Sequence, residues 1–203
     1  MKPLCIDLYC GLGGWAEGFL AEGYDCIGFD IERHDYGTGG YPGQLVLQDV
    51  LTLHGSQFRN AAVIVASPPC QQYSLWGMRM FYPSPPEPDL TLWRAALRIA
   101  VEADVPLIVE NVRGAQYFWG RAAWKCGPYY LWGDVPALMP KLKPKRKNMI
   151  DDIKNGERRG MAHEFQHCSS KSLMRKRLTA EAAKIPFELS RYVASVYNPG
   201  VLA

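Results

Sequence analysis

The 203-residue sequence contains no hydrophobic run long enough to span a membrane, and it has no internal repeat or low-complexity tract. Its first residues also lack the apolar segment of a secretory signal peptide and include an acidic residue at position 7. Hydrophobic residues make up 48% of the chain, so there is material for a sizeable core and no compositional sign of disorder. These observations predict one soluble, cytoplasmic domain with no membrane partner.

The cysteines give little support for disulfide bonds or a metal site. Six of them are spread over a chain too large to be a disulfide scaffold, so reduced thiols are expected. An H-x3-H spacing at His163 and His167, with Cys126 and Cys168 elsewhere, resembles half of a zinc site, but the paired C-x2-C half is missing. We therefore expect no bound metal.

The charges are unevenly distributed, although the net charge of +3 is small. Residues 141–177 contain twelve Lys and Arg against four Asp and Glu, a local balance of +8. The rest of the chain has eleven basic and sixteen acidic residues, a balance of −5. A basic stretch within a mildly acidic domain is typical of proteins that bind a polyanion, but a solvated charged face gives the same pattern, so both interpretations stay open.

Short apolar runs with the length and composition of buried strands occur along the first half of the chain. They are residues 3–9, 26–29, 45–47, 61–66 and 106–110. Helical patterns at residues 15–21 and 90–103 alternate with them, and Pro186 opens a final amphipathic helix over residues 185–196. This alternation predicts an α/β fold with a doubly wound, mostly parallel sheet. Ligands of such sheets bind at the carboxyl ends of the strands.

Polar residues follow the predicted strands at this edge. They are a glycine turn at residues 11–14, then Asp30, Asp49, Cys70 and Glu110. Glycine lets a ligand approach the backbone closely, because no Cβ stands in the way. The carboxylate of Asp7, just before the turn, disfavours a phosphate and favours a cofactor with an amino or sulfonium group. Asp30 is placed to bind ribose hydroxyls, although a cap or turn role is an alternative.

Two residues, Cys70 and Glu110, have the chemistry of a nucleophile and an acid. Pro68 and Pro69 stiffen the loop that carries the thiol, although a lone cysteine is often simply a small buried hydrophobe. Glu110 ends a buried strand, where an unpaired carboxyl has a raised pKa and can hold a proton near neutral pH. An ion pair between Glu110 and Arg113 is the alternative.

Three stretches together carry a family resemblance. D-L-Y-C-G-L-G-G at residues 7–14, S-P-P-C-Q at residues 67–71 and E-N-V at residues 110–112 resemble the cofactor loop, the nucleophile loop and the acid motif of the C5-cytosine DNA methyltransferases. The resemblance covers residues 4–112 and indicates a small member of the phage or bacterial type. It implies the Rossmann-like fold of S-adenosylmethionine-dependent methyltransferases.

The resemblance assigns roles to individual residues. The implied cofactor, S-adenosyl-L-methionine, would contact Asp7, Tyr9, Gly11, Gly13, Gly14, Asp30, Ile31, Asp49 and Pro68. Cys70 would attack the target cytosine, with Glu110 on the ring nitrogen and Asn111 beside it in the catalytic set. DNA would contact Gln71, Ser74, Arg113, Lys143, Lys145, Arg146 and Lys147. Family members often have Phe in place of Tyr9, a mild departure.

The resemblance also implies a division of the chain. Residues 1–140 would form the catalytic and cofactor-binding domain, residues 141–180 a basic, reduced target-recognition segment, and residues 181–203 a C-terminal helix that returns to the catalytic domain. A recognition segment this small predicts a short or degenerate target of about two to four bases. We expect a monomer that acts on a flipped or single-stranded cytosine of DNA in a bacterial or phage-infected cell.

Three other functions are compatible with the same motifs. They are methylation of cytosine in RNA, transfer of a different group from a modified S-adenosylmethionine, and nucleic-acid binding without catalysis on the same fold. Intact Cys70 and Glu110 argue against the last of these. Trp119 and Trp132 are candidates to stack on unpaired bases, although packing in the core is the preferred interpretation for each.

Overall fold

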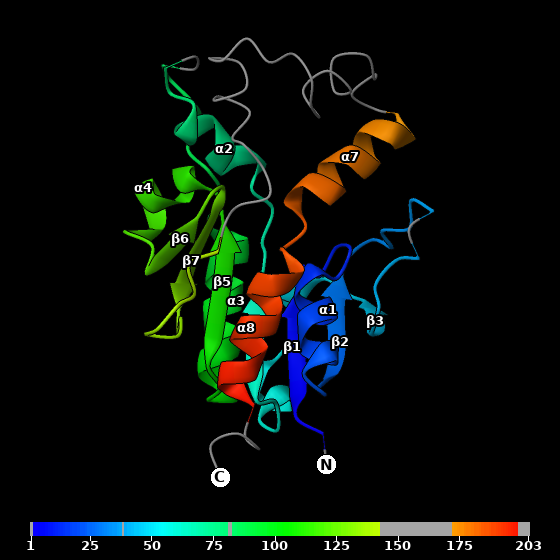
Figure 1. The fold of residues 1–203 in the computed structure, drawn as a ribbon. Helices are drawn as coiled ribbons and strands as arrows, with labels where there is room; N and C mark the ends of the chain where they lie inside the picture. Colours follow the sequence, from blue (N-terminus) through cyan, green and yellow to red (C-terminus); the bar gives the residue numbers. More distant parts are fainter. Residues whose placement is uncertain (1, 38, 81–82, 143–171, 199–203) are drawn as a thin grey trace.

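The computed structural model describes residues 2–37, 39–80, 83–142 and 172–198, which form a seven-stranded sheet between layers of helices (Figure 1). The order of the strands across the sheet is β3-β2-β1-β4-β5-β7-β6. The strands are β1 (Leu4–Leu8), β2 (Asp25–Asp30), β3 (Gln44–Leu47), β4 (Val63–Ala66), β5 (Leu107–Asn111), β6 (Trp124–Cys126) and β7 (Tyr129–Gly133).

The winding of the chain reverses at β1. This strand pairs in parallel with β2 on one side and with β4 on the other, and the pairs β2–β3 and β4–β5 are parallel as well. Only β7 breaks the pattern within the described strands, because it pairs antiparallel with both β5 and β6. The sheet is therefore doubly wound and mostly parallel, as predicted, with its switch point between β1 and β4.

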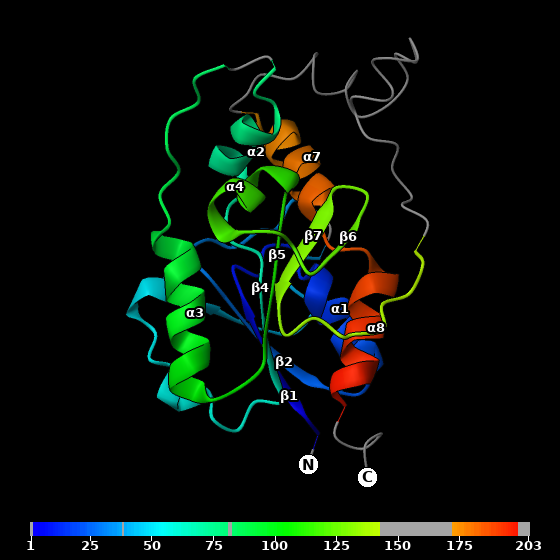
Figure 2. The same cartoon turned by 90° about the vertical axis from the view of Figure 1, so that its left-hand side faces the viewer.

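Helices cover both faces of the sheet. Helices α1 (Gly14–Ala21) and α8 (Phe187–Tyr197) pack together on one face, and α3 (Thr91–Ala103) covers the other (Figure 2). Helices α2 (Gln71–Gly77) and α7 (Leu173–Ala183) lie beyond the carboxyl ends of the parallel strands in both views. The shorter helical elements are η1 (Val50–Thr52), η2 (Gly55–Phe58), η3 (Arg113–Ala115) and α4 (Gln116–Trp119).

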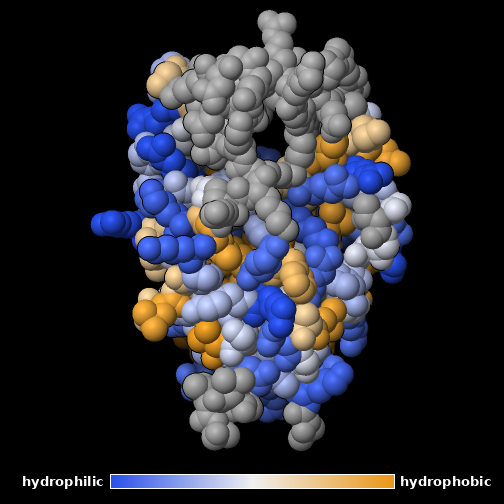
Figure 3. All heavy atoms as spheres, in the orientation of Figure 1, coloured by the Kyte–Doolittle hydropathy of each residue, from blue (hydrophilic) through white to orange (hydrophobic). Residues whose placement is uncertain are grey.

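Polar and apolar side chains are mixed on one face of the molecule (Figure 3). Figure 3 shows hydrophilic side chains interspersed with hydrophobic ones over the face formed by α1 and α8. Within the described parts of the chain, no helix combines the length and the hydrophobicity that crossing a membrane requires.

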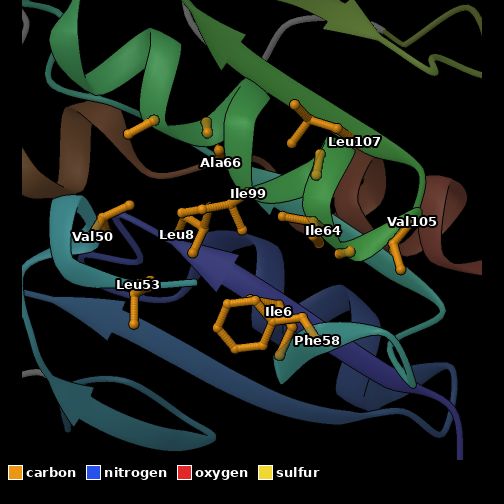
Figure 4. Packing of buried hydrophobic residues seen from close by; sticks show 14 of the residues in the cluster. Ile6, Leu8, Val50, Leu53, Phe58, Ile64, Ala66, Ile99, Val105 and Leu107 are labelled. Carbon is orange, nitrogen blue, oxygen red and sulfur yellow. The ribbon is translucent and has the colours of Figure 1, made fainter. Parts of the chain in front are cut away.

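Alternation along β1 sends its side chains into two separate cores. Ile6 and Leu8 face α3 and belong to one core (Figure 4). Cys5 faces the other way and packs in the second core with Trp15 of α1. Asp7 lies on the same face as Cys5 and is 0% exposed. The strand pattern thus places a carboxyl group inside the protein, directly behind the glycine turn.

The predicted elements are confirmed to within one or two residues at their ends, but the β6–β7 hairpin was not predicted. Its aromatic residues pack inward. Trp132 is only 5% exposed, and the ring of Trp119 stacks on that of Trp93 with centroids 4.0 Å apart and an angle of 8° between the planes. Core packing is therefore the correct interpretation of Trp119 and Trp132, and neither ring is free to stack on a base.

The contact between α1 and α8 supplies a test of the fold. A Cβ on Gly18 would overlap the backbone of Ser190 and Arg191, and Ser190 also donates a hydrogen bond to the carbonyl of Trp15. We expect Gly18→Ala to lower the free energy of unfolding by about 1–3 kcal/mol, the usual cost of overpacking. Urea unfolding followed by circular dichroism measures it.

Gly77→Ala is the matched control, because a Cβ there would come no closer than 3.5 Å to the nearest backbone atom. This variant should stay within about 1 kcal/mol of the wild type. Equal unfolding midpoints for the two variants would contradict the helix packing described above.

Candidate active site

A cleft of about 580 Å³ lies at the carboxyl ends of β1 and β2. Its walls come from the turn after β1, the loop after β2, the start of η1, the loop after β4 and one side of α7. Such a position, beside the switch point of a doubly wound sheet, is where ligands of these folds bind. The cleft is therefore the candidate cofactor site.

Most of the residues predicted to contact the cofactor line this cleft. They are Tyr9, Gly11, Gly14, Asp30, Ile31 and Asp49. The other three lie nearby but not on its surface. Asp7 is buried behind the turn, Gly13 is covered by Tyr41 and Pro42, and the proline that lines the cleft is Pro69 rather than Pro68.

The turn after β1 needs unusual backbone conformations. Gly11 and Gly13 have φ values of 50° and 73°, a region that residues with a Cβ rarely adopt. Tyr9 has the same conformation, with φ 59°, although it is not glycine. Its hydroxyl donates a hydrogen bond of 2.8 Å to the carbonyl of Leu92, which ties the strained residue to the start of α3. Backbone strain of this kind is concentrated at functional sites.

Asp30 joins the end of β2 to the glycine turn. Its Oδ2 accepts a hydrogen bond of 3.0 Å from the Gly11 amide, and its Oδ1 accepts one of 3.3 Å from the Glu32 amide. Burial alone would raise the pKa of Asp30, but hydrogen bonds from His34 and Gly11 lower it below its ordinary value. The side chain is thus an ionised hydrogen-bond acceptor on the cleft wall. It also stabilises the turns through the Gly11 and Glu32 amides, which was the alternative role considered for Asp30.

Asp7 is the clearest sign that the site is built around a polar ligand. The group is fully buried, and no hydrogen bond of good geometry reaches either of its carboxylate oxygens from the described residues, although the Tyr41 hydroxyl and the Ala16 amide lie close enough to lower its pKa. Burial, followed by the proximity of Cys26, raises its pKa well above the ordinary value. A buried carboxyl behind the turn, with ionised Asp30 and exposed Asp49 on the wall, fits a cofactor with amino and ribose groups.

The loop between β4 and α2 carries Cys70 at the rim of the cleft. Pro69 and Gln71, on either side of it, both line the cleft, and Cys70 itself is partly exposed. Burial and then the charge of Glu110 raise the pKa of the thiol. In the free protein the group is therefore a thiol at neutral pH, and it must lose its proton before it can act as a nucleophile.

Asn111 and Ser74 hold this loop in place. The side-chain amide of Asn111, at the end of β5, donates a hydrogen bond of 2.8 Å to the carbonyl of Pro68. The hydroxyl and the amide of Ser74 donate to the carbonyl of Cys70 at 3.0 and 2.9 Å. Both residues therefore hold the loop that carries Cys70 in place.

Glu110 lies beside this loop at the end of β5. Its burial raises its pKa to about 8, and a hydrogen bond from Ser67 limits the rise. The oxygen of Ser67 in turn accepts a hydrogen bond of 3.1 Å from the indole of Trp15. The alternative pairing with Arg113 is not found, because no ion pair in the described structure involves Glu110. Glu110 is thus a neutral acid next to the thiol at pH 7.

The predicted nucleic-acid contacts are only partly visible. Gln71 is exposed on the cleft rim and Arg113 is exposed on η3. Lys143, Lys145, Arg146 and Lys147 lie outside the described residues, as does most of the basic stretch. In the parts that the structure describes, no group of three or more acidic, His or Cys side chains is arranged to hold a metal ion.

Several residues of the cleft carried no signal in the sequence. His34 and Tyr36 are in an irregular loop after β2. Lys176 is in α7, and Lys184 is the residue that follows this helix. The helical pattern of α7 was not recognised, because its apolar residues do not repeat with a helical period. The one sequence feature that could have indicated these cleft residues is that His34 and Tyr36 follow Asp30 by four and six residues.

The titration of Glu110 can be tested without assuming a function. Its carboxyl keeps a proton in the folded protein up to a pKa of about 8, whereas an unfolded glutamate loses it near about 4.3. The folded state therefore binds more protons in this window, so this group makes the free energy of unfolding fall as pH rises. We expect Glu110→Gln to flatten that fall in urea titrations across the window.

Glu87→Gln, at an exposed glutamate, serves as the control and should keep the wild-type pH dependence. The burial argument for Glu110 is wrong if the two variants and the wild type show the same dependence.

Comparison with known proteins agrees with this geometry. A family model described as C-5 cytosine-specific DNA methylase matches residues 4–118. The type II methyltransferase M1.HphI of Haemophilus parahaemolyticus is 33% identical over 87 residues, which cover 38% of this chain and 23% of that protein. The chain thus matches less than a quarter of the length of this relative.

Solved structures show more distant similarity. A putative DNA modification methyltransferase encoded within an E. coli prophage has 23% identity and a TM-score of 0.41, over 56% of this chain and 33% of its own. The Dnmt2 methyltransferase of S. pombe has 18% identity and a TM-score of 0.38, over 57% of this chain and 36% of its own.

The match to the family model supports both the predicted family and the predicted cofactor. It supports S-adenosyl-L-methionine as the cofactor of the cleft. The matched residues make up more than half of the chain and include all three motifs singled out in the sequence. The protein belongs to the C-5 cytosine-specific DNA methylase family.

Proposed function

We propose that the protein transfers a methyl group from S-adenosyl-L-methionine to C5 of cytosine in DNA, through a covalent bond between Cys70 and C6 of the base. One observation carries the proposal. The loop that presents Cys70 forms the rim of the cofactor cleft, through Pro69 and Gln71, and has the protonated acid Glu110 beside it. A nucleophile, an acid and a cofactor site thus meet at one edge of the sheet.

The chemistry needs both side chains. C5 of cytosine is too weak a nucleophile to accept a methyl group directly, but addition of the Cys70 thiolate to C6 turns the ring into an enamine that is nucleophilic at C5. Glu110 donates its proton to N3 and stabilises the charge that develops during addition. When bound, the cofactor supplies an electrophilic methyl group on its sulfonium. Transfer of the C5 proton to a water molecule then breaks the C6–S bond, so that Cys70 leaves as a thiolate, N3 returns its proton to Glu110 and the aromatic ring is restored.

The raised pKa of Glu110 also helps the thiol to ionise. An ionised Glu110 would repel a thiolate at Cys70, and this charge is one cause of the raised pKa of Cys70. Because burial keeps Glu110 neutral up to a pKa of about 8, that repulsion is absent at neutral pH. C6 of cytosine cannot be reached inside a stacked duplex, so the base must be extruded or unpaired before it meets these residues.

The cleft residues supply the cofactor contacts. Ile31 is 71% exposed on the cleft wall, where it can pack against the adenine ring. We assign the ribose hydroxyls to Asp30 and the adenine amine to Asp49, whose Oδ1 is already held by the Leu51 amide at 2.9 Å. We place the amino group of the methionine part at the glycine turn, in front of the buried carboxyl of Asp7.

The outer end of α2 offers a surface for the nucleic acid. The guanidinium of Arg79 lies 5.0 Å from the ring centre of Trp76 and 5.7 Å from that of Tyr117, which is 56% exposed. Arg79 and Arg113 are both exposed, and no described ion pair involves either. A cation held against aromatic rings, in the turn that follows the helix beginning beside Cys70, suits a phosphate next to the target base.

Trapping of the covalent intermediate tests the reaction. DNA that contains 5-fluorocytosine should form a stable adduct with the wild type, since fluorine at C5 prevents the proton loss that releases the cysteine. Cys70→Ala should form no adduct and transfer no methyl group, while its affinity for the cofactor in calorimetry stays unchanged. Denaturing gel electrophoresis and mass spectrometry detect the adduct.

Cys126→Ala is the control, because Cys126 is another partly exposed free thiol, on β6. It should form the adduct as the wild type does. Near-normal methyl transfer by Cys70→Ala would refute the mechanism. If the wild type methylated RNA and not DNA, the proposed DNA substrate would be wrong.

The phosphate contact is tested by the salt dependence of binding. Arg79→Gln should weaken DNA binding and reduce the slope of log K against log salt concentration by about 1, the effect of one lost phosphate contact. Arg59→Gln is the matched control, since this exposed arginine follows η2 at the opposite edge of the sheet. If both variants show the same slope of log K against log salt concentration, Arg79 does not contact a phosphate.

A further inference from the structure

A chain of polar contacts runs along the wall of the cofactor cleft. The hydroxyl of Tyr36 lies 3.0 Å from Nδ1 of His34, and Nε2 of His34 lies 3.4 Å from Oδ1 of Asp30. Oδ2 of Asp30 accepts the hydrogen bond from the Gly11 amide at 3.0 Å. All four residues line the cleft. The loop after β2 is thus connected, side chain by side chain, to the glycine turn after β1.

The direction of the hydrogen bonds in this chain follows from Asp30. An ionised carboxylate only accepts, so Nε2 of His34 must carry a proton towards it. When His34 is neutral, its Nδ1 accepts from the hydroxyl of Tyr36, and when it is charged, Nδ1 donates to the same oxygen. The chain therefore stays connected in both charge states of the imidazole.

The charged groups around His34 favour this arrangement. Its hydrogen bond with Asp30 raises the pKa of His34, burial opposes the rise, and the charges of Asp30 and Glu32 add to it. The positive charge of Lys176, on α7, lowers the pKa of His34. The side chains of His34 and Asp30 are only 21% and 12% exposed, so their interaction is partly shielded from water.

We propose that His34 is a positioning residue for the cofactor, which acts by fixing the carboxylate of Asp30 in the orientation that binds both the glycine turn and the ribose. A carboxylate has about four acceptor positions. The Gly11 and Glu32 amides and His34 occupy three of them, so the remaining one is left for a ribose hydroxyl. Without His34, Oδ1 can rotate away and the carboxylate loses a partner within the cleft.

This inference rests on the proposed function, since it requires S-adenosyl-L-methionine to occupy the cleft. Calorimetry with that cofactor is therefore the first measurement. His34→Ala should bind it about three- to tenfold more weakly than the wild type, the effect of one lost hydrogen bond. His34→Gln keeps a donor for Asp30 and should recover most of the affinity. His54→Ala, at an exposed histidine before η2, should bind like the wild type.

A double-mutant cycle separates positioning from a direct contact. In an Asp30→Asn background, His34→Ala should cost little further affinity, because His34 acts through the carboxylate. An NMR titration of the imidazole without cofactor gives a second readout. The proton should reside on Nε2, and Asp30→Asn should lower the pKa of His34.

The outcomes separate this inference from the proposed function. If the wild type binds the cofactor and His34→Ala binds it equally well, or if the loss persists undiminished in the Asp30→Asn background, the inference is overturned while the proposed function stands. A wild type that does not bind the cofactor overturns both.

Discussion

The parallel pairing of β1 with β2 and β4 is the constraint on which the rest of the structure depends. In register, Leu8 lies opposite Phe29 and Ala66, so the strands end at one edge and their following loops meet there. β5 extends the edge through the pairing of Ala66 with Val109. Residues almost 100 positions apart, from Gly11 of the glycine turn to Glu110, are thereby collected at one edge of the sheet without any of these loops having to fold on its own.

Burial sets the pKa values of the carboxyl groups at this edge of the sheet. The cores on both sides of the sheet exclude water from the ends of β1 and β5, and this raises the pKa values of Asp7 and Glu110. Asp30, at the end of β2, keeps a low pKa because amides and His34 surround it with donors. Carboxyl groups at the same edge of the sheet therefore differ in pKa, which is lowered for Asp30 and raised for Asp7 and Glu110. In the proposed reaction, Asp30 is an acceptor for the ligand and Glu110 is a proton donor.

Much of this could be read from the sequence. Strand lengths, glycine turns and the three motifs are local signals, so the sequence alone predicts the fold, the family and Asp30, Cys70 and Glu110 as candidate site residues. The burial of Asp7 on the face opposite Ile6 and Leu8 follows from the same alternation, although it removes this residue from the cleft surface.

What the sequence did not reveal depends on tertiary contacts. The positive φ of Tyr9 is held by a bond to Leu92, and the interaction of His34 with Asp30 depends on the path of an irregular loop. The strand β7 lacks a simple alternation of polar and apolar residues because both of its faces are buried. Tyr130 and Trp132 pack towards α2 and α4, whereas Tyr129 and Leu131 pack in the core on the other face of the sheet. The predicted domain limits and the basic recognition segment at residues 141–180 stay predictions, since residues 143–171 of this segment lie outside the described residues.

The central claim is that this edge of the sheet methylates C5 of cytosine. Incubation of the protein with DNA and S-adenosyl-L-methionine carrying an isotope-labelled methyl group, followed by digestion to nucleosides and mass spectrometry, tests it most directly. The account predicts the label in 5-methylcytosine, with none in other nucleosides. Label on an exocyclic nitrogen of cytosine or adenine, or a transferred group with a mass other than that of methyl, would contradict it.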